Sequence, residues 1–376
     1  MKTFAELDIE NNGQYIKLLS AVAKLSGLFS ENTIPYINYR VAEKIFCKSF
    51  NANDLSRSDT AYDASYKSIG VGLKTFNCPT NSSTEKVAEF NSLSGELRDY
   101  RGKKLACKLA QYRNERIDLA NRLYKIKSSI YHIVARKDNE LVLFETDYDK
   151  IDLNNIKSVN STSSSLQFED GKNSYRYNYS KSTLFRKFYI PEGAHHIPVD
   201  IIENPFSLLL ELFENNDLKP AKDKLKKGIN YVVLPLYGIK RGQKFVFEKS
   251  GLNQWNAGGR KRTYGEVEIR IPKQIHNQFP GFFPERDKPF GLKTPAGEKL
   301  QAKVCQDDSK ALMTNPNKAL SDWLLRKIFQ AEEKEVLTIE KMNKLGFDSV
   351  RIEKTDNSNY KIDISPINSY EKFINQ

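Results

Sequence analysis

Short strand-like segments, separated by turn-forming residues, follow one another from about Gly228 to the end of the chain. β-Branched and aromatic residues favour strands, and Gly, Pro, Asn and Asp end them. The pattern therefore predicts a mainly-β domain that contains one helix, at Lys318–Gln330. The predicted strands are Tyr231–Leu236, Lys244–Phe247, Glu266–Ile271, Leu300–Val304, Val350–Lys354 and Tyr360–Ile364.

The first half of the chain mixes helical and strand patterns. Spacing of apolar residues predicts helices, and short apolar runs between turn residues predict strands. The predicted helices are Gln14–Leu28, Pro35–Cys47, Glu85–Leu97 and Lys103–Lys127. The predicted strands are two within Ala61–Phe76, then Tyr131–Arg136, Leu141–Glu145, Ser165–Glu169 and Ser174–Tyr179.

These patterns divide the 376 residues into three parts. Residues 1–190 form an α/β (α+β) domain, residues 191–225 a connector, and residues 226–376 the mainly-β domain. The connector contains one apolar run, Phe206–Phe213, which predicts a single helix, and it ends in a lysine-rich stretch.

Charge and composition limit the classes of partner. The chain has 59 Lys and Arg against 47 Asp and Glu, a formal net charge of +12, which suits a polyanion such as DNA. The basic residues of Lys103–Lys127 form either a solvated face or contacts to phosphates. No apolar run is long enough to span a membrane, and an early acid argues against a signal peptide. The four cysteines are isolated in the sequence, so we expect reduced thiols in a cytoplasmic protein.

Histidine is scarce, and this excludes several nuclease chemistries. The chain has four histidines, and none is followed by a lysine two residues later, as a phospholipase-D-type nuclease requires. They also form no cluster with asparagine that a ββα-metal nuclease needs. Catalysis is therefore expected to depend on carboxylates and lysine.

One segment places such residues on a small sheet. Asp63 lies at the end of one predicted strand, and Lys74 ends a buried strand eleven residues later. This spacing resembles the PD-(D/E)XK nucleases, in which carboxylates hold Mg²⁺ and a lysine positions the attacking water. The sequence departs from that pattern because Gly72 occupies the position of the second acid. The alternative is a purely structural role, in which Lys74 is a solvated strand end and Asp63 only terminates a strand.

The resemblance implies where the missing metal ligands would come from. Some members of that superfamily take the second acid from a neighbouring helix, and Glu43 or Glu85 could supply it here. The carbonyl of Leu73 is a further candidate ligand. The segment from Glu85 to Asn91 also resembles the helix that follows the lysine strand in restriction enzymes.

Two segments of the mainly-β domain combine turn formers with side chains that can read DNA bases. Asn, Gln and Arg form bidentate contacts to adenine or guanine in the major groove. The candidates in the first segment are Lys249, Ser250, Asn253, Gln254, Trp255, Asn256, Arg260 and Arg262, and those in the second are Gln306, Asp307, Asp308, Lys310, Met313 and Asn315. Arg260 and Arg262 are expected to read bases, whereas Lys240 and Lys244 are expected to contact phosphates. Trp255 and Met313 could instead pack in the core, and the two aspartates could orient basic side chains.

Three blocks of this region resemble the C-terminal domain of NgoFVII-type restriction endonucleases. They are Ser250–Arg262, Ile271–Pro284 and Lys303–Arg326. That domain is similar to the plant transcription-factor pseudobarrel and to the DNA-reading domains of BfiI and EcoRII. The resemblance implies a seven-stranded open barrel that grips the major groove with two arms, here Ser250–Arg262 and Gln306–Asn315.

The combined prediction is a type II restriction endonuclease that hydrolyses double-stranded DNA with Mg²⁺. Such a protein is expected to share its system with a cognate DNA methyltransferase, and a homodimer is one arrangement open to it. Two alternatives stay open: a DNA-binding protein without catalytic activity, and a nuclease that depends on base modification.

Overall fold

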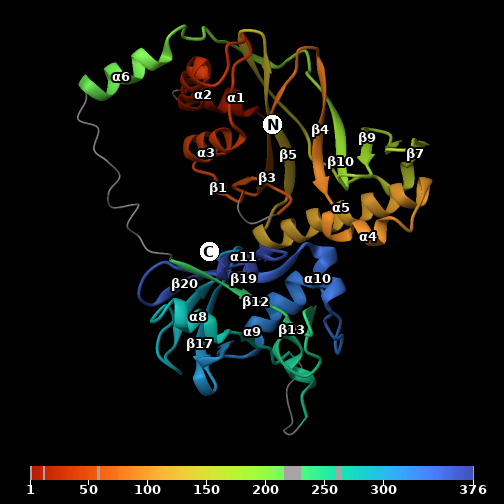
Figure 1. The fold of residues 1–376 in the computed structure, drawn as a ribbon, viewed down its shortest axis with the longest axis vertical. Coiled ribbons are helices and arrows are strands. Elements are labelled where there is room, and N and C mark those ends of the chain that lie inside the picture. Colours follow the sequence, from red (N-terminus) through yellow and green to blue (C-terminus); the bar gives the residue numbers. More distant parts are fainter. Residues whose placement is uncertain (1, 12, 57–59, 216–229, 259–264, 376) are drawn as a thin grey trace. The chain divides into compact units, whose positions relative to one another are not determined.

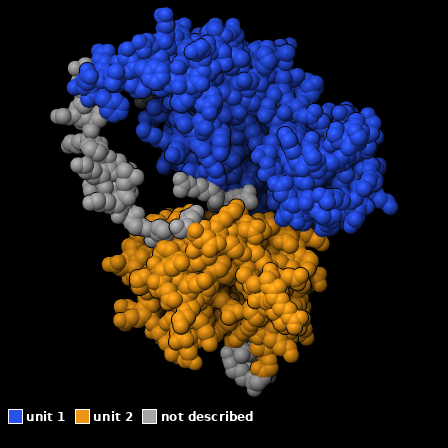
Figure 2. Space-filling model, viewed as in Figure 1, with its two compact units in different colours: residues 1–121, 126–220 blue, residues 122–125, 221–376 orange. Residues whose placement is uncertain are grey.

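The computed structural model describes residues 2–11, 13–56, 60–215, 230–258 and 265–375. The chain divides into two compact units, which Figure 2 shows in different colours. The first unit comprises Met1–Asn121 and Ile126–Pro220, and the second comprises Arg122–Lys125 and Ala221–Gln376. None of the described helices is long and apolar enough to cross a membrane.

A six-stranded sheet forms the centre of the first unit. Its strand order is β1-β2-β3-β5-β6-β11, and β3 and β5 are parallel whereas the other neighbours are antiparallel. The strands are β1 (Asn53–Asp54), β2 (Ala64–Tyr66), β3 (Ile69–Asn77), β5 (Ser128–Lys137), β6 (Glu140–Asp147) and β11 (His195–Pro198). The strand predictions within Ala61–Phe76 and from Tyr131 to Glu145 are confirmed.

Three N-terminal helices pack against this sheet (Figure 1): α1 (Phe4–Glu10), α2 (Gln14–Lys24) and α3 (Tyr39–Phe50). The shared core contains Leu19 and Phe46 from the helices and Val71, Leu73 and Val134 from the strands. α3 begins four residues later than Pro35, because the side chain of Asn38 accepts a hydrogen bond from the amide of Arg40 and caps the helix there.

A second sheet lies beside the long helix α5 (Gly102–Tyr124) in the same unit. Its order is β4-β10-β9-β8-β7, and all of its pairs are antiparallel. The strands are β4 (Ser82–Glu89), β7 (Lys157–Ser161), β8 (Ser165–Glu169), β9 (Ser174–Asn178) and β10 (Thr183–Tyr189). Leu105 and Leu109 of α5 pack against Phe168, Tyr177 and Leu184 on one face of this sheet.

The helix predicted at Glu85–Leu97 is wrong. Residues 82–89 are strand β4, and only α4 (Ser94–Leu97) is α-helical in this segment. Glu, Lys and Ala favour helices, but β4 pairs with β10 along its length, with a register shift beside Val87. Tertiary pairing thus overrides the local preference. The resemblance of Glu85–Asn91 to a helix after the lysine strand is therefore also wrong.

The segment after residue 190 belongs in part to the first unit. β11 pairs with β6 through His195–Leu143 and Ile197–Leu141, so it extends the six-stranded sheet beyond the boundary predicted at residue 190. Helix α6 (Pro205–Asn215) follows it, as predicted from the apolar run.

A nearly closed seven-stranded sheet forms the second unit. Its order is β12-β19-β20-β16-β17-β18-β15, with β16 and β20 parallel, and the two edge strands β12 and β15 contact each other. The strands are β12 (Tyr231–Pro235), β15 (Ile269–Arg270), β16 (Phe290–Lys293), β17 (Lys299–Cys305), β18 (Ala311–Thr314), β19 (Phe347–Lys354) and β20 (Asn359–Pro366). The predicted helix at Lys318–Gln330 is present as α9 (Lys318–Ser321), which continues as a wider helical segment at Asp322–Ile328.

Candidate functional site

Asp63 and Lys74 line one cavity of the first unit. The cavity has a volume of about 190 Å³, and Lys86, Arg113 and Arg116 contribute three further cations to its wall. Thr60, Ala61, Val87, Ala88, Glu89, Ile117, Tyr131 and Tyr148 complete the lining. The structure thus brings the two principal residues of the sequence motif together in a polar, mainly cationic hollow.

Asp63 is held in place by the strand that carries Lys74. Its Oδ2 accepts a hydrogen bond of 2.7 Å from the amide of Leu73, and its own amide donates to the carbonyl of Val71 at 3.0 Å. Burial raises the pKa of the Asp63 carboxyl above its usual value, although the charge of Lys74 and the Leu73 amide oppose this shift. A nearby cation would stabilise the ionised form of a carboxylate that is buried in this way.

Glu43 is the second carboxylate of this region. It projects from α3, which packs on β3, and Arg40 Nη1 lies 3.0 Å from its Oε2. Burial raises the pKa of Glu43, and the negative charge of Asp63 raises it further. A divalent cation near Asp63 and Glu43 would favour the ionised form of both carboxylates.

Glu85 occupies a different position. It lies on β4 with its carboxylate 2.5 Å from the hydroxyl of Ser83, and it does not line the cavity. Burial raises its pKa, and the charge of Lys74 acts in the opposite direction. Asp63 acts electrostatically on Glu43 but is not among the groups that shift the pKa of Glu85. Glu43 does not line the cavity either, and its electrostatic interaction with Asp63 is what distinguishes it from Glu85.

Close packing explains why Gly72 replaces the acid of the motif. A Cβ atom at this position would lie 2.7 Å from the ring of Tyr148 and 2.9 Å from the ring of Tyr131. These two rings pack against each other in a tilted arrangement with their centroids 4.0 Å apart, so neither can move aside without losing its partner. A side chain at position 72 therefore has no space, so a second acid could only come from another element.

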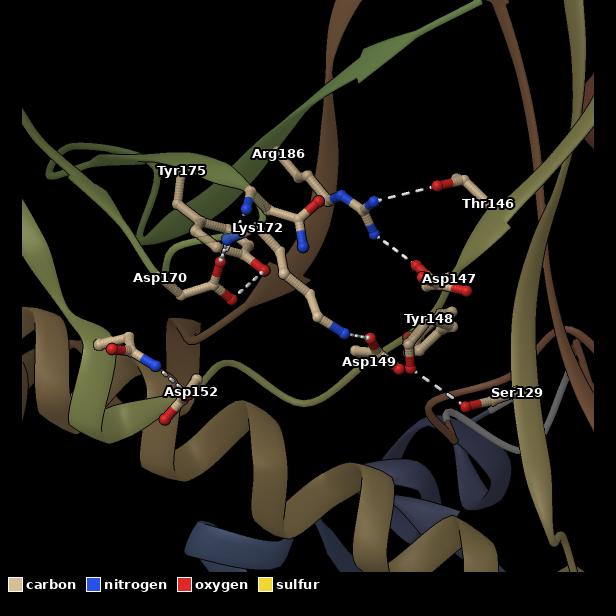
Figure 3. Close-up of polar contacts among 12 residues, drawn as sticks. Ser129, Thr146, Asp147, Tyr148, Asp149, Asp152, Asp170, Lys172, Tyr175 and Arg186 are labelled. Atoms are coloured by element: carbon tan, nitrogen blue, oxygen red, sulfur yellow. Dashed lines mark hydrogen bonds and ion pairs between the residues drawn. The ribbon is translucent and has the colours of Figure 1, made fainter. Parts of the chain in front are cut away.

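Buried arginines surround the same rings. Arg186 donates to the carbonyl of Asp147 at 2.6 Å and to the hydroxyl of Thr146 at 3.2 Å, as Figure 3 shows. Arg113, which lines the cavity, donates to the carbonyl of Asp149 at 2.8 Å and lies over the ring of Tyr148. Its Nε has no hydrogen-bond partner within the described part of the chain. The sequence pattern of α5 gave no sign that this arginine would be buried.

The first of the two segments predicted to read DNA, Ser250–Arg262, contains a short 3₁₀ helix at Gly251–Asn256. Lys249 and Asn256 are exposed, whereas Ser250, Gln254 and Trp255 are half-buried. Arg260 and Arg262 lie outside the described residues.

Asn253 is completely buried, contrary to its predicted contact with DNA. Its amide donates to the carbonyls of Phe247 and Leu337, each at 3.0 Å, and accepts from the amide of Leu337 at 2.9 Å. These hydrogen bonds fix the start of the first arm to neighbouring backbone, so Asn253 positions the segment and is not available to a DNA base.

The second segment, Gln306–Asn315, forms the turn between β17 and β18 and continues along β18. Asp307, Asp308, Lys310 and Asn315 are exposed, and Met313 is half-buried. Three non-glycine residues of the turn have positive φ angles, namely Gln306, Asp308 and Ser309. Such strain is typical of functional turns. His276 lies 3.0 Å from the carbonyl of Ser309 and supports the turn from α8 (Lys273–Gln278).

Glu268 connects the two arms. Its amide donates to the carbonyl of Gly251 in the first arm at 3.1 Å, and its buried carboxylate accepts a hydrogen bond from the side chain of Gln306 in the second. Next to it, the exposed side chain of Arg270 lies over the ring of Phe247 and beside the second arm. Sequence reasoning missed both residues, although alternating charged and apolar residues from Glu266 to Ile271 indicate that they share one face of a strand.

Lys244 does not have the position of a phosphate contact. Its Nζ lies 2.7 Å from a carboxylate oxygen of Asp348, which is fully buried, and 2.7 Å from one of Glu371. It also donates to the side chain of Asn368 at 2.6 Å and lies over the ring of Tyr237. Its role is to neutralise buried acids. Lys240, by contrast, is exposed.

The nearly closed seven-stranded sheet, with its two arms tied together at one place, defines a pseudobarrel. A comparison with protein families agrees: residues 230–356 match the family of the NgoFVII C-terminal B3-like DNA-binding domain. The match covers most of the second unit, so the resemblance predicted from the sequence is confirmed for this domain. A B3-like domain of restriction enzymes indicates sequence-specific DNA binding. No curated protein matched the chain in a further comparison.

Proposed function

We propose that the chain is a type II restriction endonuclease that hydrolyses double-stranded DNA with Mg²⁺. The observation that carries this proposal is the convergence of Asp63 and Lys74 on one cavity, with Glu43 in electrostatic reach of Asp63. The B3-like domain supports a restriction enzyme as the context in which such a cavity would act.

The described residues contain no group of three or more potential metal-ligating side chains, so a divalent cation here would depend on Asp63, one further carboxylate, and oxygens of the backbone, water and DNA. Mg²⁺ prefers oxygen ligands and commonly uses one or two carboxylates. Asp63 and Glu43 would hold it, with the carbonyl of Leu73 as a further candidate, and the ion would polarise the phosphate and a bound water. Burial raises the pKa of both acids, and a bound cation would lower it again by favouring the ionised forms.

Lys74 and the basic lining would serve the DNA. Lys74 lies two residues after Gly72 on the same side of β3, and its ammonium would orient the attacking water and stabilise developing negative charge. Lys86 and Arg116 also line the cavity, and Arg116 donates to the carbonyl of Glu89 at 3.1 Å, which fixes its direction. These cations would neutralise the phosphates on either side of the reacting one.

Recognition would reside in the second unit. The exposed residues of the two arms would enter the major groove, where Asn256, Asn315 and Lys310 could contact base edges. Glu268 would keep the arms at a fixed separation. A cognate methyltransferase would protect host sites, and two copies of the chain would allow both strands to be cut.

The test is cleavage of phage DNA by purified protein with Mg²⁺ or with EDTA. Discrete fragments are expected with Mg²⁺ only. Asp63→Asn and Lys74→Ala should each abolish cleavage and leave specific binding within a few-fold, because recognition lies in the other unit. Asp138→Asn and Lys67→Ala, which replace exposed residues of the same type in neighbouring turns, are the controls and should cut normally. Cleavage at the wild-type rate by either Asp63→Asn or Lys74→Ala would refute the assignment of the centre.

A further inference from the structure

The second sheet of the first unit presents an open face opposite the one that packs on α5. Five residues in register form a row across all five strands: Lys86 on β4, Phe185 on β10, Arg176 on β9, Gln167 on β8 and Asn160 on β7. Four inter-strand spacings make the row about 19 Å long. We call this surface the open sheet face.

The open sheet face is hollowed. A depression of about 530 Å³ is lined along the row by Asn160, Gln167 and Arg176, with Thr84 and Lys187 beside it. These five side chains are exposed. Arg176 and Lys187 form no ion pair within the described part of the chain, and Glu169 is the acid in the lining. The hollow therefore offers two cations against one carboxylate, together with amide groups.

Aromatic rings accompany these charges. Arg176 lies over the ring of Phe185 at 5.4 Å, and Lys187 lies over the ring of Tyr189 at 5.0 Å. Phe185, Lys187 and Tyr189 alternate along β10 and so share one face. The ring of Tyr189 is 61% exposed, although Lys187 lies over it.

We propose that the open sheet face is a second nucleic-acid site, and that it binds a single-stranded segment. Cations would neutralise the phosphates, the rings of Phe185 and Tyr189 would stack on bases, and Gln167 and Asn160 would contact base edges. A single strand fits this surface because its bases expose both faces and edges, whereas in a duplex the base faces are stacked inside.

The face is separate from the arms of the second unit, and its binding does not rest on the proposed cleavage reaction. Lys86 belongs both to the row and to the lining of the cavity that contains Asp63 and Lys74. A strand on the open sheet face would therefore run to the edge of that cavity.

The experiment measures the binding of a fluorescent oligothymidine to the full chain in EDTA, by anisotropy at several salt concentrations. The double variant Arg176→Ala/Lys187→Ala should weaken binding about tenfold or more and reduce the slope of log affinity against log salt by about 1.4, at ~0.7 per phosphate contact. Phe185→Leu keeps an apolar side chain without a ring and should weaken binding at least about fivefold, the loss expected for one stacked base. All variants should keep the wild-type affinity for a specific duplex.

Lys181→Ala is the matched control, because Lys181 is an exposed cation in the turn between β9 and β10 and does not line the hollow. It should bind oligothymidine almost as the wild type does. The proposal is overturned if the double variant binds as tightly as Lys181→Ala. It is also overturned if duplex affinity falls as much as single-strand affinity, or if Phe185→Leu has no effect, since the face would then be only a general electrostatic surface.

Discussion

Lys244 provides the sharpest test of the second unit, because its predicted and observed roles lead to opposite results. In the structure its ammonium neutralises the fully buried Asp348 and also contacts Glu371. Partial burial acts to raise the pKa of Glu371. Hydrogen bonds from Lys244 and Tyr237 nevertheless hold this pKa below its usual value. Lys244→Ala should leave a buried carboxylate without its cation.

Removing one partner of a buried ion pair costs about 3–5 kcal/mol. The side chain of Lys244 is 24% exposed, so we expect the lower end, about 3 kcal/mol. For a unit of this size that loss lowers Tm by roughly 6–12 °C. The double variant Lys244→Ala/Asp348→Asn should recover part of the loss, because the amide needs no cation.

Tryptophan fluorescence during urea unfolding of the full chain measures the stability of the second unit selectively. The two tryptophans of the chain, Trp255 and Trp323, both belong to the second unit. Lys240→Ala, the replacement of an exposed lysine nearby, is the control and should not change stability. The reasoning fails if Lys244→Ala unfolds like the wild type while its DNA affinity and salt dependence fall, since Lys244 would then be a phosphate contact.

Two further predictions follow from buried contacts. Asn253→Ala should destabilise the second unit by about 2 kcal/mol or more, because it leaves the polar groups of Leu337 and Phe247 unsatisfied. Asn256→Ala replaces an exposed residue and should not change stability. If the two variants are equally stable in urea unfolding, the role given to Asn253 is wrong. Gly72→Ala should destabilise the first unit by about 1–3 kcal/mol through overpacking against the tyrosine rings; thermal unfolding by circular dichroism measures it, and an unchanged Tm would show that the rings can move.

Strong local signals allowed several correct predictions from the sequence. The short run Ile69–Leu73 predicted a buried strand, and the pattern of Lys103–Lys127 predicted a long helix. The scarcity of histidine favoured carboxylate and lysine chemistry, and Asp63 and Lys74 do line one cavity. The blocks around the two arms identified the pseudobarrel.

Other features depended on contacts between residues far apart in sequence, which no local pattern encodes. Glu85 lies on a strand because β10 pairs with its segment, and Glu43 interacts electrostatically with Asp63 because α3 packs on β3. Asn253 and Lys244 carry the same polar groups as residues that bind DNA, but the fold turns them inward to satisfy buried partners. The sequence by itself determined which chemical groups the protein has and which periodic elements carry them. The tertiary structure alone decided which of these groups are buried and stabilise the fold and which remain exposed, because burial and pairing are set by the packing of distant segments.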